Sequence, residues 1–294
     1  MYKPTNQADF VTYVQDQLDN RCVAMLDPET SINITTPVTF TLGDSGGHLM
    51  GLKANGAKFS WAGGLSSVDM ITFEADVSCR NLIIEGLSLY GAGYEGTQCD
   101  NGLVFKAPKD KAIYKAVIRD CVSAYFGAAG IVCKGDFYES LIINAQCENN
   151  LGDGLIIANG GDGGIASNVM VVAPNLSRNL GYGLKLTSAH SVDVSLGSFI
   201  VNKLGGIYAS NGIRYVNGVN FENSGLTGII VPTSDYITTV RDCHASSDGT
   251  TTAPGGTAMR YLIDFDGAAG KIQHSGLYVT YYGGGTDNMA VWKP

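Results

Sequence analysis

NGLVF at Gly102, GIVC at Gly130, GLII at Gly154, GLKL at Gly183, GIYA at Gly206 and GIIV at Gly228 are six versions of one short phrase between Asn101 and Val231. Each phrase places an aliphatic residue directly after an anchor glycine and another buried-looking residue two positions further on. The steps between successive anchor glycines are 28, 24, 29, 23 and 22 residues. A period of roughly 20 to 50 residues is typical of a solenoid, in which each repeat stacks on the next.

A second apolar run precedes each anchor glycine. These runs are LIIEGLSL from Leu82, AVIRDCV from Ala116, LIINAQC from Leu141, VMVVAPNL from Val169, VDVSLGSF from Val192 and IRYVNGVNF from Ile213. Two or three short strands per repeat, separated by Gly and Asn turns, leave no room for a helix, which excludes ankyrin-like, tetratricopeptide-like and βα units. We therefore predict an all-β fold, a parallel β-helix whose coils hydrogen-bond to one another at about 4.8 Å.

Length and composition fit one long domain. The 294 residues are 45% hydrophobic and only 16% charged, so the chain can bury a continuous core. The 39 glycines fit a fold with several turns per coil, where a positive φ is often required. We predict a single β-helix domain over 1–294, with an N-terminal cap and first strands in 1–45, central coils in 46–245, and the last coil and C-terminal cap in 246–294.

Both ends of such a solenoid need cover, because an open sheet end exposes unpaired backbone groups. Phe10, Val14 and Leu18 stand at helical spacing with Asp9 as a candidate N-cap, so we predict a short amphipathic helix over the first coil. After Val231 the repeat loosens. The aromatic residues expected to cover the last coil, within one chain or between chains, are Tyr278, Tyr281, Tyr282 and Trp292.

Charge and hydropathy exclude several classes of protein. A net charge of −8 and a pI near 4.9 argue against a nucleic-acid partner, which requires basic stripes to neutralise phosphate. No run of about eighteen apolar residues occurs, so no membrane span is expected. The opening MYKPTNQADF lacks the apolar core of a signal peptide, which fits a cytosolic protein, a phage virion protein or a mature extracellular form.

The cysteines and motifs point to no cofactor. The seven cysteines are odd in number and form no CxxC pair. Cys121, Cys133, Cys147 and Cys243 lie in or beside apolar strands, so we expect buried free thiols, with disulfides or a reactive thiol as the alternative. No zinc spacing, P-loop, GxSxG or Rossmann glycine motif occurs. Calcium stays open, because Asp-rich turns on a β-helix can hold it with backbone carbonyls.

The order of elements near the N-terminus resembles a known superfamily. The expected helix is followed by CVAMLDPETSINITTPVTFTL, a strand pair with a Pro turn, and by the glycine-rich HLMGLKANGAKFSWAGG. This order resembles right-handed parallel β-helix proteins of the pectate-lyase-like superfamily, most of all the smaller phage tailspikes, polysaccharide lyases and alginate epimerases. Over nearly the whole chain, the resemblance implies that fold, a polysaccharide substrate, an extracellular or virion-associated location and, as in many tailspikes, a homotrimer.

Signatures of single families are absent. The polygalacturonase set of NTD, paired DD, GHG and RxK does not occur, and neither does a DPYD-like epimerase signature or the GDGVTDD opening of many tailspikes. GGDGG at Gly160–Gly164 lacks the GGxGxD order of a calcium-binding nonapeptide and is interpreted as a flexible turn. No residue role is therefore transferred from the superfamily.

Stacked coils turn the repeat into a map of neighbours. Counted from the anchor glycine, positions +1 and +3 face the core and position +2 faces outward, where the aliphatic residues of the earlier coils imply a covered or sugar-contacting face. In successive coils, position +2 is Lys185 and then Tyr208, and position −1 is Asp153 and then Tyr182. We predict that these four residues form a patch across three coils, with His190 a few residues beyond on a turn.

The patch fits β-elimination or C5-epimerisation of a uronate. A lysine neutralises the substrate carboxylate, which makes the α-proton more acidic, and a Tyr or His removes that proton. The alternative is that Tyr and Lys only decorate the surface of a sheet. Lys106 and Lys134 share position +4 and repel each other unless an anion lies between them, which is a further argument for binding an acidic glycan.

Two other functions stay open. A glycoside hydrolase needs two carboxylates at about 5 Å for retention or about 6.5–9.5 Å for inversion. Candidate carboxylates are Asp136, Glu139, Asp153 and Asp162, of which Asp162 is also a candidate for substrate binding, although a turn Asp usually binds only its own backbone. A non-catalytic glycan-binding tailspike or adhesin module is the other alternative, because a fold does not fix a function.

Two cross-coil pairs are expected on the upstream strands. Asp193 and Arg214 both stand second in such a strand, so we expect an ion pair, with binding of a substrate carboxylate as the alternative. Asn220 and His244 have the same relation, and for this His we expect a structural role.

Overall fold

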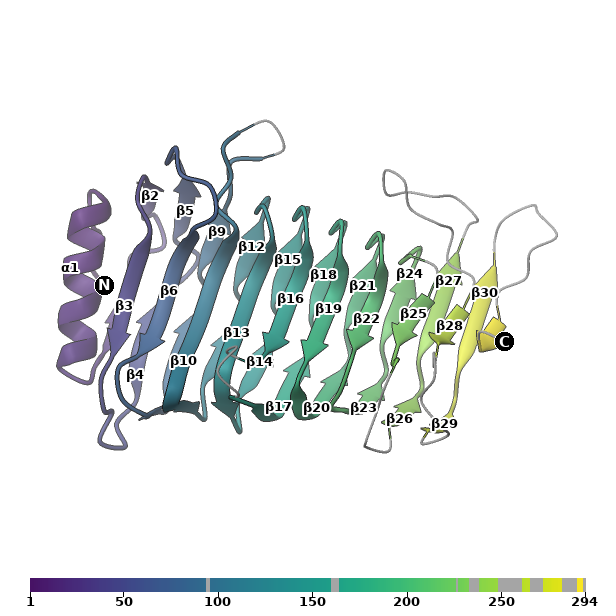
Figure 1. The fold of residues 1–294 in the computed structure, drawn as a ribbon. Helices are drawn as coiled ribbons and strands as arrows, with labels where there is room; N and C mark the ends of the chain where they lie inside the picture. Colours follow the sequence, from purple (N-terminus) through teal and green to yellow (C-terminus); the bar gives the residue numbers. More distant parts are fainter. Residues whose placement is uncertain are drawn as a thin grey trace.

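The computed structural model describes residues 1–93, 96–159, 164–225, 227–232, 238–247, 261–264, 272–281 and 290–292, and these form an all-β solenoid with one helix at its N-terminal end (Figure 1). In each coil the chain passes through three rows of strands, of which two belong to one 21-stranded sheet and the third is a 10-stranded sheet, and neighbouring coils pair through parallel strands. The coils follow one another from the helix at one end to the last strand at the other. The predicted parallel β-helix is therefore confirmed.

The two rows of strands in the 21-stranded sheet are called sheet 1 and sheet 2, and the 10-stranded sheet is called sheet 3. Sheet 1, which carries the anchor phrases, consists of β3 (Val38–Leu42), β6 (Asp69–Ala75), β10 (Asn101–Tyr114), β13 (Ala129–Tyr138), β16 (Asp153–Ala158), β19 (Tyr182–Thr187), β22 (Gly205–Ala209), β25 (Thr227–Ile230), β28 (Tyr261–Asp264) and β31 (Ala290–Trp292). Sheet 2 consists of β1 (Val23–Met25), β4 (Met50–Lys53), β8 (Leu82–Glu85), β11 (Val117–Arg119), β14 (Leu141–Ile143), β17 (Ala166–Val172), β20 (Ala189–Ser195), β23 (Ile213–Asn217), β26 (Thr238–Arg241) and β29 (Ile272–Ser275). Sheet 3 consists of β2 (Ser31–Ile34), β5 (Lys58–Trp61), β9 (Ser88–Tyr90), β12 (Val122–Ala124), β15 (Gln146–Glu148), β18 (Asn175–Ser177), β21 (Ser198–Ile200), β24 (Asn220–Glu222), β27 (His244–Ser247) and β30 (Tyr278–Tyr281).

Sheets 1 and 2 are joined by two long strands. The end of β10 pairs with β7 (Cys79–Arg80), and the end of β13 pairs with the start of β17. Both strands therefore begin in sheet 1 and finish in sheet 2.

The anchor phrases stack in the register that the repeat predicts. The column one residue after the anchor glycine contains Leu103, Ile131, Leu155, Leu184, Ile207, Ile229 and Ile263, each paired with the next. All of these side chains are buried. The outward column at +2 is itself covered at Val104 and Val132, whose exposed fractions are 0% and 1%.

Glycine is required at the anchor positions because a Cβ atom there would clash with neighbouring atoms, and not because the backbone adopts a positive φ. A Cβ atom on Gly183 would lie 2.6 Å from Cδ1 of Phe199 and 2.9 Å from the carbonyl oxygen of Gly206 in the next coil. None of the six anchors has a positive φ, so the expected need for positive φ does not explain these glycines. Asn144 and Asn149 are among the residues that supply left-handed turns instead, with φ of 51° and 56°.

A ladder of buried asparagines lies at the corner between sheet 3 and sheet 1. Asn150, Asn179 and Asn202 are fully buried, and each stands four residues before an anchor glycine. The Nδ2 of Asn150 donates to Oδ1 of Asn179, and the Nδ2 of Asn179 donates to Oδ1 of Asn202, both at 2.8 Å. The same two oxygens accept the backbone N–H groups of Asn150 and Asn179 at 3.2 Å. The ladder thus satisfies polar groups that the corner buries.

A row of phenylalanines continues from the helix into the core. Helix α1 (Gln7–Asp19) contributes Phe10, whose ring lies 5.5 Å from that of Phe40. The row continues through Phe73, Phe105 and Phe137, with centroid separations of 5.1, 5.8 and 6.2 Å. Contacts of this kind stabilise the stack beyond the burial of the rings. The predicted capping helix over the first coil is confirmed.

The N-cap of the helix is one turn earlier than the sequence predicts. The side chain of Asn6 accepts a hydrogen bond from the backbone N–H of Asp9 at 3.0 Å, which makes Asn6 the N-cap. The carboxylate of Asp9 accepts the backbone N–H of Thr5 at 3.2 Å. The prediction of Asp9 as N-cap is therefore wrong, because Asp9 belongs to the reciprocal half of the capping arrangement.

All seven cysteines are free. Cys22 is exposed, and the other six are buried, including the four for which buried thiols are predicted. Burial raises the pKa of the Cys121 thiol to about 12. Buried thiols of this kind behave as small apolar side chains.

At the C-terminal end, Tyr278 is 63% exposed. Tyr281 and Trp292 lie in β30 and β31, and Tyr282 lies outside the described residues. Within the described ranges, no helix is both long and apolar enough to cross a membrane.

Replacing Asn179 by Ala tests the ladder. The change leaves the backbone N–H and the side-chain amide of Asn150 without their acceptor in a buried corner, so we expect a loss of about 3 kcal/mol in the free energy of unfolding. Urea unfolding followed by circular dichroism measures it. The control is Asn33→Ala at an exposed position of β2, and equal losses in the two variants would refute the role of the ladder.

Replacing Gly183 by Ala tests the anchor. The added Cβ must displace Phe199 or the next coil, so we expect a loss of about 1–3 kcal/mol in unfolding free energy. Gly64→Ala is the matched control, since a Cβ there meets nothing within 4 Å, and its stability should be unchanged or slightly higher. A Gly183→Ala protein as stable as the control would contradict the steric explanation.

Candidate functional site

Four predicted residues meet on the outer face of sheet 1. Lys185 pairs in register with Tyr208, and Tyr182 pairs with Gly205 on the same two strands, β19 and β22. Asp153 begins β16, the neighbouring strand on the other side. Asp153, Tyr182, Lys185 and Tyr208 are called the sheet 1 patch below.

Asp153 contacts two other residues of the patch, Tyr182 and Lys185. Its Oδ1 accepts the backbone N–H of Tyr182 at 2.7 Å, and its Oδ2 lies 3.4 Å from Nζ of Lys185. A Cβ on Gly181 would lie 2.2 Å from Oδ1 of Asp153, so the glycine before Tyr182 makes room for the carboxylate. Asp153 is only 8% exposed. Both of its oxygens are engaged, and the carboxylate therefore orients Lys185.

The two tyrosines form a stacked pair beside Lys185. The ring centroids of Tyr182 and Tyr208 are 4.9 Å apart with an interplanar angle of 28°. Burial, followed by the influence of Tyr208 and Asp153, raises the pKa of Tyr182 above its ordinary value. At neutral pH the hydroxyl of Tyr182 is therefore a proton donor and not a phenolate.

His190 is not part of the patch. It lies in β20 of sheet 2, where it pairs with Ser167, so the prediction that it lies on a turn beside the patch is wrong. The chain rounds the corner between the sheets at Ser188, which has a φ of 55°. That corner separates His190 from Lys185 although only five positions divide them in sequence.

Asp193 and Arg214 also lie on sheet 2, and they form the expected ion pair. Nε of Arg214 donates to Oδ1 of Asp193 at 2.9 Å, and its NH2 group contacts Oδ2. A β-bulge places Tyr215, not Arg214, opposite Asp193, and the arginine reaches back across it. The pair holds coils together, and binding of a substrate carboxylate by these residues stays a prediction.

His244 takes the structural position expected of it. Its ring nitrogens lie 3.1 Å from Oδ1 of Asn220 and 3.0 Å from Oγ1 of Thr280. These contacts connect three successive coils of sheet 3.

Lys106 and Lys134 are neighbours in register, as the repeat predicts. The neighbour of Lys106 on the other side is Glu74, whose carboxylate lies 3.0 Å from Nζ of Lys106. The repulsion is therefore relieved by a side chain of the protein. Lys134 makes no ion pair with any residue of the described ranges, so the prediction that it binds an anion stays open.

Among the candidate carboxylates of a hydrolase, Asp136 lies too far from Asp153 to pair with it. Asp136 accepts hydrogen bonds from the hydroxyl of Tyr138 at 2.8 Å and from the backbone of Ile165 at 2.7 Å. Asp153 pairs with Ala129, seven residues before Asp136, which separates the two carboxylates by roughly 20 Å and exceeds either hydrolase distance.

The other two candidates are Glu139 and Asp162. Glu139 is bound to Lys115 at 3.8 Å. Asp162 lies outside the described residues. The described part of the chain has no group of three His, Cys, Asp or Glu residues that could hold a metal ion, and the predicted option of calcium stays a prediction.

The comparisons with known proteins are structural. No protein-family model matches the sequence, and no curated protein matches it. The enzymatically active domain of tailspike protein 2 from bacteriophage CBA120 superposes with a TM-score of 0.61 at 13% identity, covering 91% of this chain and 43% of that one. Pectate lyase Pel9A gives a TM-score of 0.52 at 11% identity, covering 87% of this chain and 69% of that one.

A third structure is similar over nearly its full length. The endo-xylogalacturonan hydrolase from Aspergillus tubingensis gives a TM-score of 0.53 at 10% identity, covering 97% of this chain and 94% of that one. The chain spans well under two thirds of the length of the phage tailspike structures that it matches. The chain therefore has the pectate-lyase-like parallel β-helix fold that these tailspike, lyase and hydrolase structures share.

Proposed function

We propose that the protein acts on a uronate-containing polysaccharide, as a lyase or C5-epimerase, at the sheet 1 patch. One observation carries the proposal: Asp153 fixes the ammonium group of Lys185 beside two stacked tyrosines on an outward face. A held cation suits a sugar carboxylate, and the aromatic pair suits the C–H face of a sugar ring.

The patch supplies groups for this chemistry. Lys185 neutralises the uronate carboxylate, so that the proton on C5 can leave. Tyr208, in register with Lys185, accepts this proton as a phenolate, after its own phenolic proton has been lost to solvent. In elimination the C5–H electrons form the C4–C5 double bond, the C4–O bond breaks, and Tyr182 protonates the leaving oxygen. In epimerisation C5 takes a proton from solvent on the face opposite Tyr208, because Tyr182 is stacked on the same side as Tyr208, and no bond of the chain breaks.

The shared fold supports this proposal at a coarser level. The structures with this fold include a pectate lyase, an endo-xylogalacturonan hydrolase and the enzymatically active domain of a phage tailspike. A polysaccharide substrate is common to the first two names. The tailspike likeness supports an extracellular or virion-associated protein, with a homotrimer as the proposed assembly.

A non-catalytic glycan-binding module is the second candidate. It is favoured by Asp153, whose two oxygens are both engaged and which therefore offers no free base. In this function Lys185 and the tyrosines bind the sugar without turnover.

A panel of uronate-containing and neutral polysaccharides separates these functions. A lyase yields unsaturated products that absorb in the ultraviolet, and an epimerase exchanges the C5 proton with solvent without cleavage. A hydrolase yields new reducing ends without the absorbance. Binding without any of these products would overturn the enzymatic proposal in favour of the second candidate.

Replacing Lys185 by Met, or Tyr208 by Phe, tests the roles in the patch. Each change removes one group of the proton-transfer step, so we expect kcat/KM on the active uronate polymer to fall roughly 100-fold or more. The matched controls are Lys58→Met on sheet 3 and Tyr278→Phe at an exposed tyrosine, which should keep full activity. Activity retained in both patch variants would place the chemistry elsewhere.

The raised pKa of Tyr182 predicts an alkaline loss of stability. Since the folded state favours the neutral phenol, the contribution of this group is complete below the ordinary pKa of 10.0 and disappears as pH rises through the higher folded-state pKa. Wild type should therefore lose more stability than Tyr182→Phe between neutral and strongly alkaline pH. Urea unfolding at a series of pH values measures this, with Tyr278→Phe as control. Parallel curves for wild type and Tyr182→Phe would contradict the prediction.

A further inference from the structure

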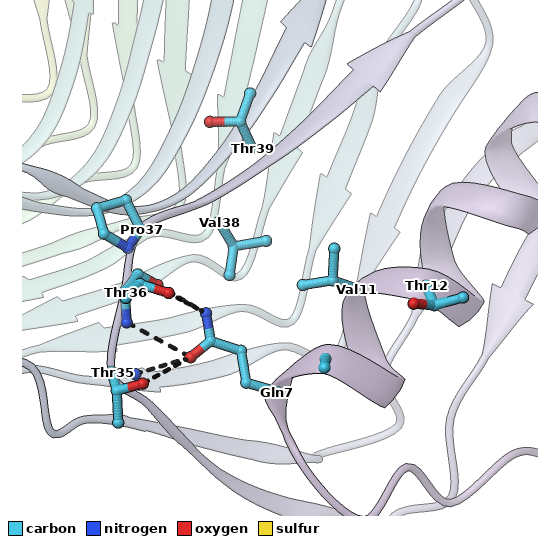
Figure 2. A pocket seen from close by; sticks show the side chains of 9 residues that line it. Gln7, Val11, Thr12, Thr35, Thr36, Pro37, Val38 and Thr39 are labelled. Carbon is cyan, nitrogen blue, oxygen red and sulfur yellow. Dashed lines mark hydrogen bonds between the residues drawn. The ribbon is translucent and has the colours of Figure 1, made fainter.

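Three adjoining cavities form a groove at the N-terminal end of sheet 1. Their volumes are about 630, 290 and 130 Å³, and Thr39 of β3 lines all three. Helix α1 borders the largest cavity, which Figure 2 shows, and Lys106 of β10 borders the second. This surface, from α1 across β3 and β6 to Lys106, is called the N-terminal groove below.

On the helix side of the groove, a polar side chain held by hydrogen bonds lies beside apolar side chains. Oε1 of Gln7 accepts the backbone N–H of Thr35 at 2.8 Å, and its Nε2 donates to the carbonyl oxygen of Thr36 at 2.8 Å (Figure 2). These bonds fix α1 against the turn before β3. Val11 and Pro37 line the same cavity, so one side offers C–H groups to a ligand.

The sheet side of the groove is lined by hydroxyl groups and by charges that are already paired. Thr39 and Thr72 stand in register on β3 and β6. Around them, three ionic or polar contacts engage the carboxylates: Glu74 with Lys106 at 3.0 Å, Asp76 with Lys111 at 3.2 Å, and Asp69 with the amide of Asn101 at 2.6 Å.

This lining selects for a neutral ligand rich in hydroxyl groups. Three carboxylates against two ammonium groups leave a small negative excess, which disfavours an anion such as a uronate. Paired carboxylates and lysines still have free lone pairs and N–H groups, and these suit hydroxyls that both donate and accept. A pyranose ring presents such hydroxyls at its edge and an apolar C–H face that fits Val11 and Pro37.

The groove is separate from the sheet 1 patch. Thr72 and Lys185 belong to one outward column, four strands apart, which corresponds to roughly 19 Å at about 4.8 Å per strand. Between them, Val104 and Val132 are buried and unavailable to a ligand. The contacts of a glycan bound in the groove are therefore separate from the contacts that the sheet 1 patch offers.

We infer that the N-terminal groove is a second glycan site, which binds neutral pyranose units, whereas the sheet 1 patch binds the charged uronate. The inference rests on the proposed function only in that both ligands are glycans. A polymer with neutral and acidic units in one chain, or two different glycans, can occupy the two sites together.

Amide chemical-shift mapping of the full chain tests this inference. The protein is titrated with neutral oligosaccharides of glucose, galactose, mannose and xylose, and separately with an oligouronate. We expect at least one neutral oligosaccharide to shift the amides of β3 and β6, and the oligouronate to shift β19 and β22. Failure of every neutral oligosaccharide to shift β3 and β6, or tighter binding of the oligouronate there, overturns the inference.

Variants connect the signal to the groove. Thr39→Trp fills the position shared by the three cavities and should weaken binding of the neutral oligosaccharide roughly tenfold or more. Ser31→Trp, an exposed position on sheet 3, is the matched control. Glu74→Gln removes a charge without changing shape and should also weaken binding, so the test does not depend on the bulky variant folding. Unchanged affinity in both groove variants refutes the site.

A further variant separates the two proposals. Lys185→Met should abolish the oligouronate signal on β19 and leave the neutral-sugar signal on β3 intact. Failure of the patch proposal alone then appears as no oligouronate signal in wild type, with the groove signal still present.

Discussion

Hydrogen bonding between neighbouring coils is the constraint on which this structure depends. Every strand pairs with its equivalent one coil away, so the corners must repeat at the same place along the axis. At the corner into sheet 1, the amides of Asn150, Asn179 and Asn202 enforce that repeat by binding one another and the backbone. The anchor glycines follow four residues later, where the next coil leaves no space for a Cβ.

The sheet 1 patch is built with the same geometry. The hydrogen bond from the backbone of Tyr182 to Asp153 joins two coils in the way that the asparagine ladder does, but at the outer surface. It leaves the other carboxylate oxygen for Lys185. One acidic side chain thus fixes the start of a strand and positions a cation. The nearly buried Asp153 therefore both stabilises the stacking of two coils and orients Lys185.

Much of this arrangement could be predicted from the sequence. The spaced glycines give the fold, the register of the core column and the proximity of Lys185 to Tyr208, because coil stacking turns a repeat into contacts. The ladder had a signal too, since Asn recurs four positions before the anchors Gly154, Gly183 and Gly206. To interpret this recurrence as a hydrogen-bonded ladder, one must know that the Asn side chain at this position points inward at a corner of the coil.

Other features depend on geometry that a repeat does not encode. The turn at Ser188 carries His190 onto another sheet, and the bulge beside Asp193 shifts the partner across from it. Glu74 neutralises Lys106 from a coil that precedes the recognisable phrases. The cavities around Thr39 arise from the packing of whole elements, including α1, and no local pattern predicts them.

The buried thiols have a consequence for where such a chain can work. A thiol exchanges with disulfides only as the thiolate, and burial of Cys79, Cys99 and Cys121 keeps them protonated and out of reach. Only Cys22 of the seven is exposed. Disulfide exchange among the six buried thiols is therefore disfavoured even in oxidising surroundings, and the rigidity of the solenoid comes from its stacked coils and not from disulfide bonds.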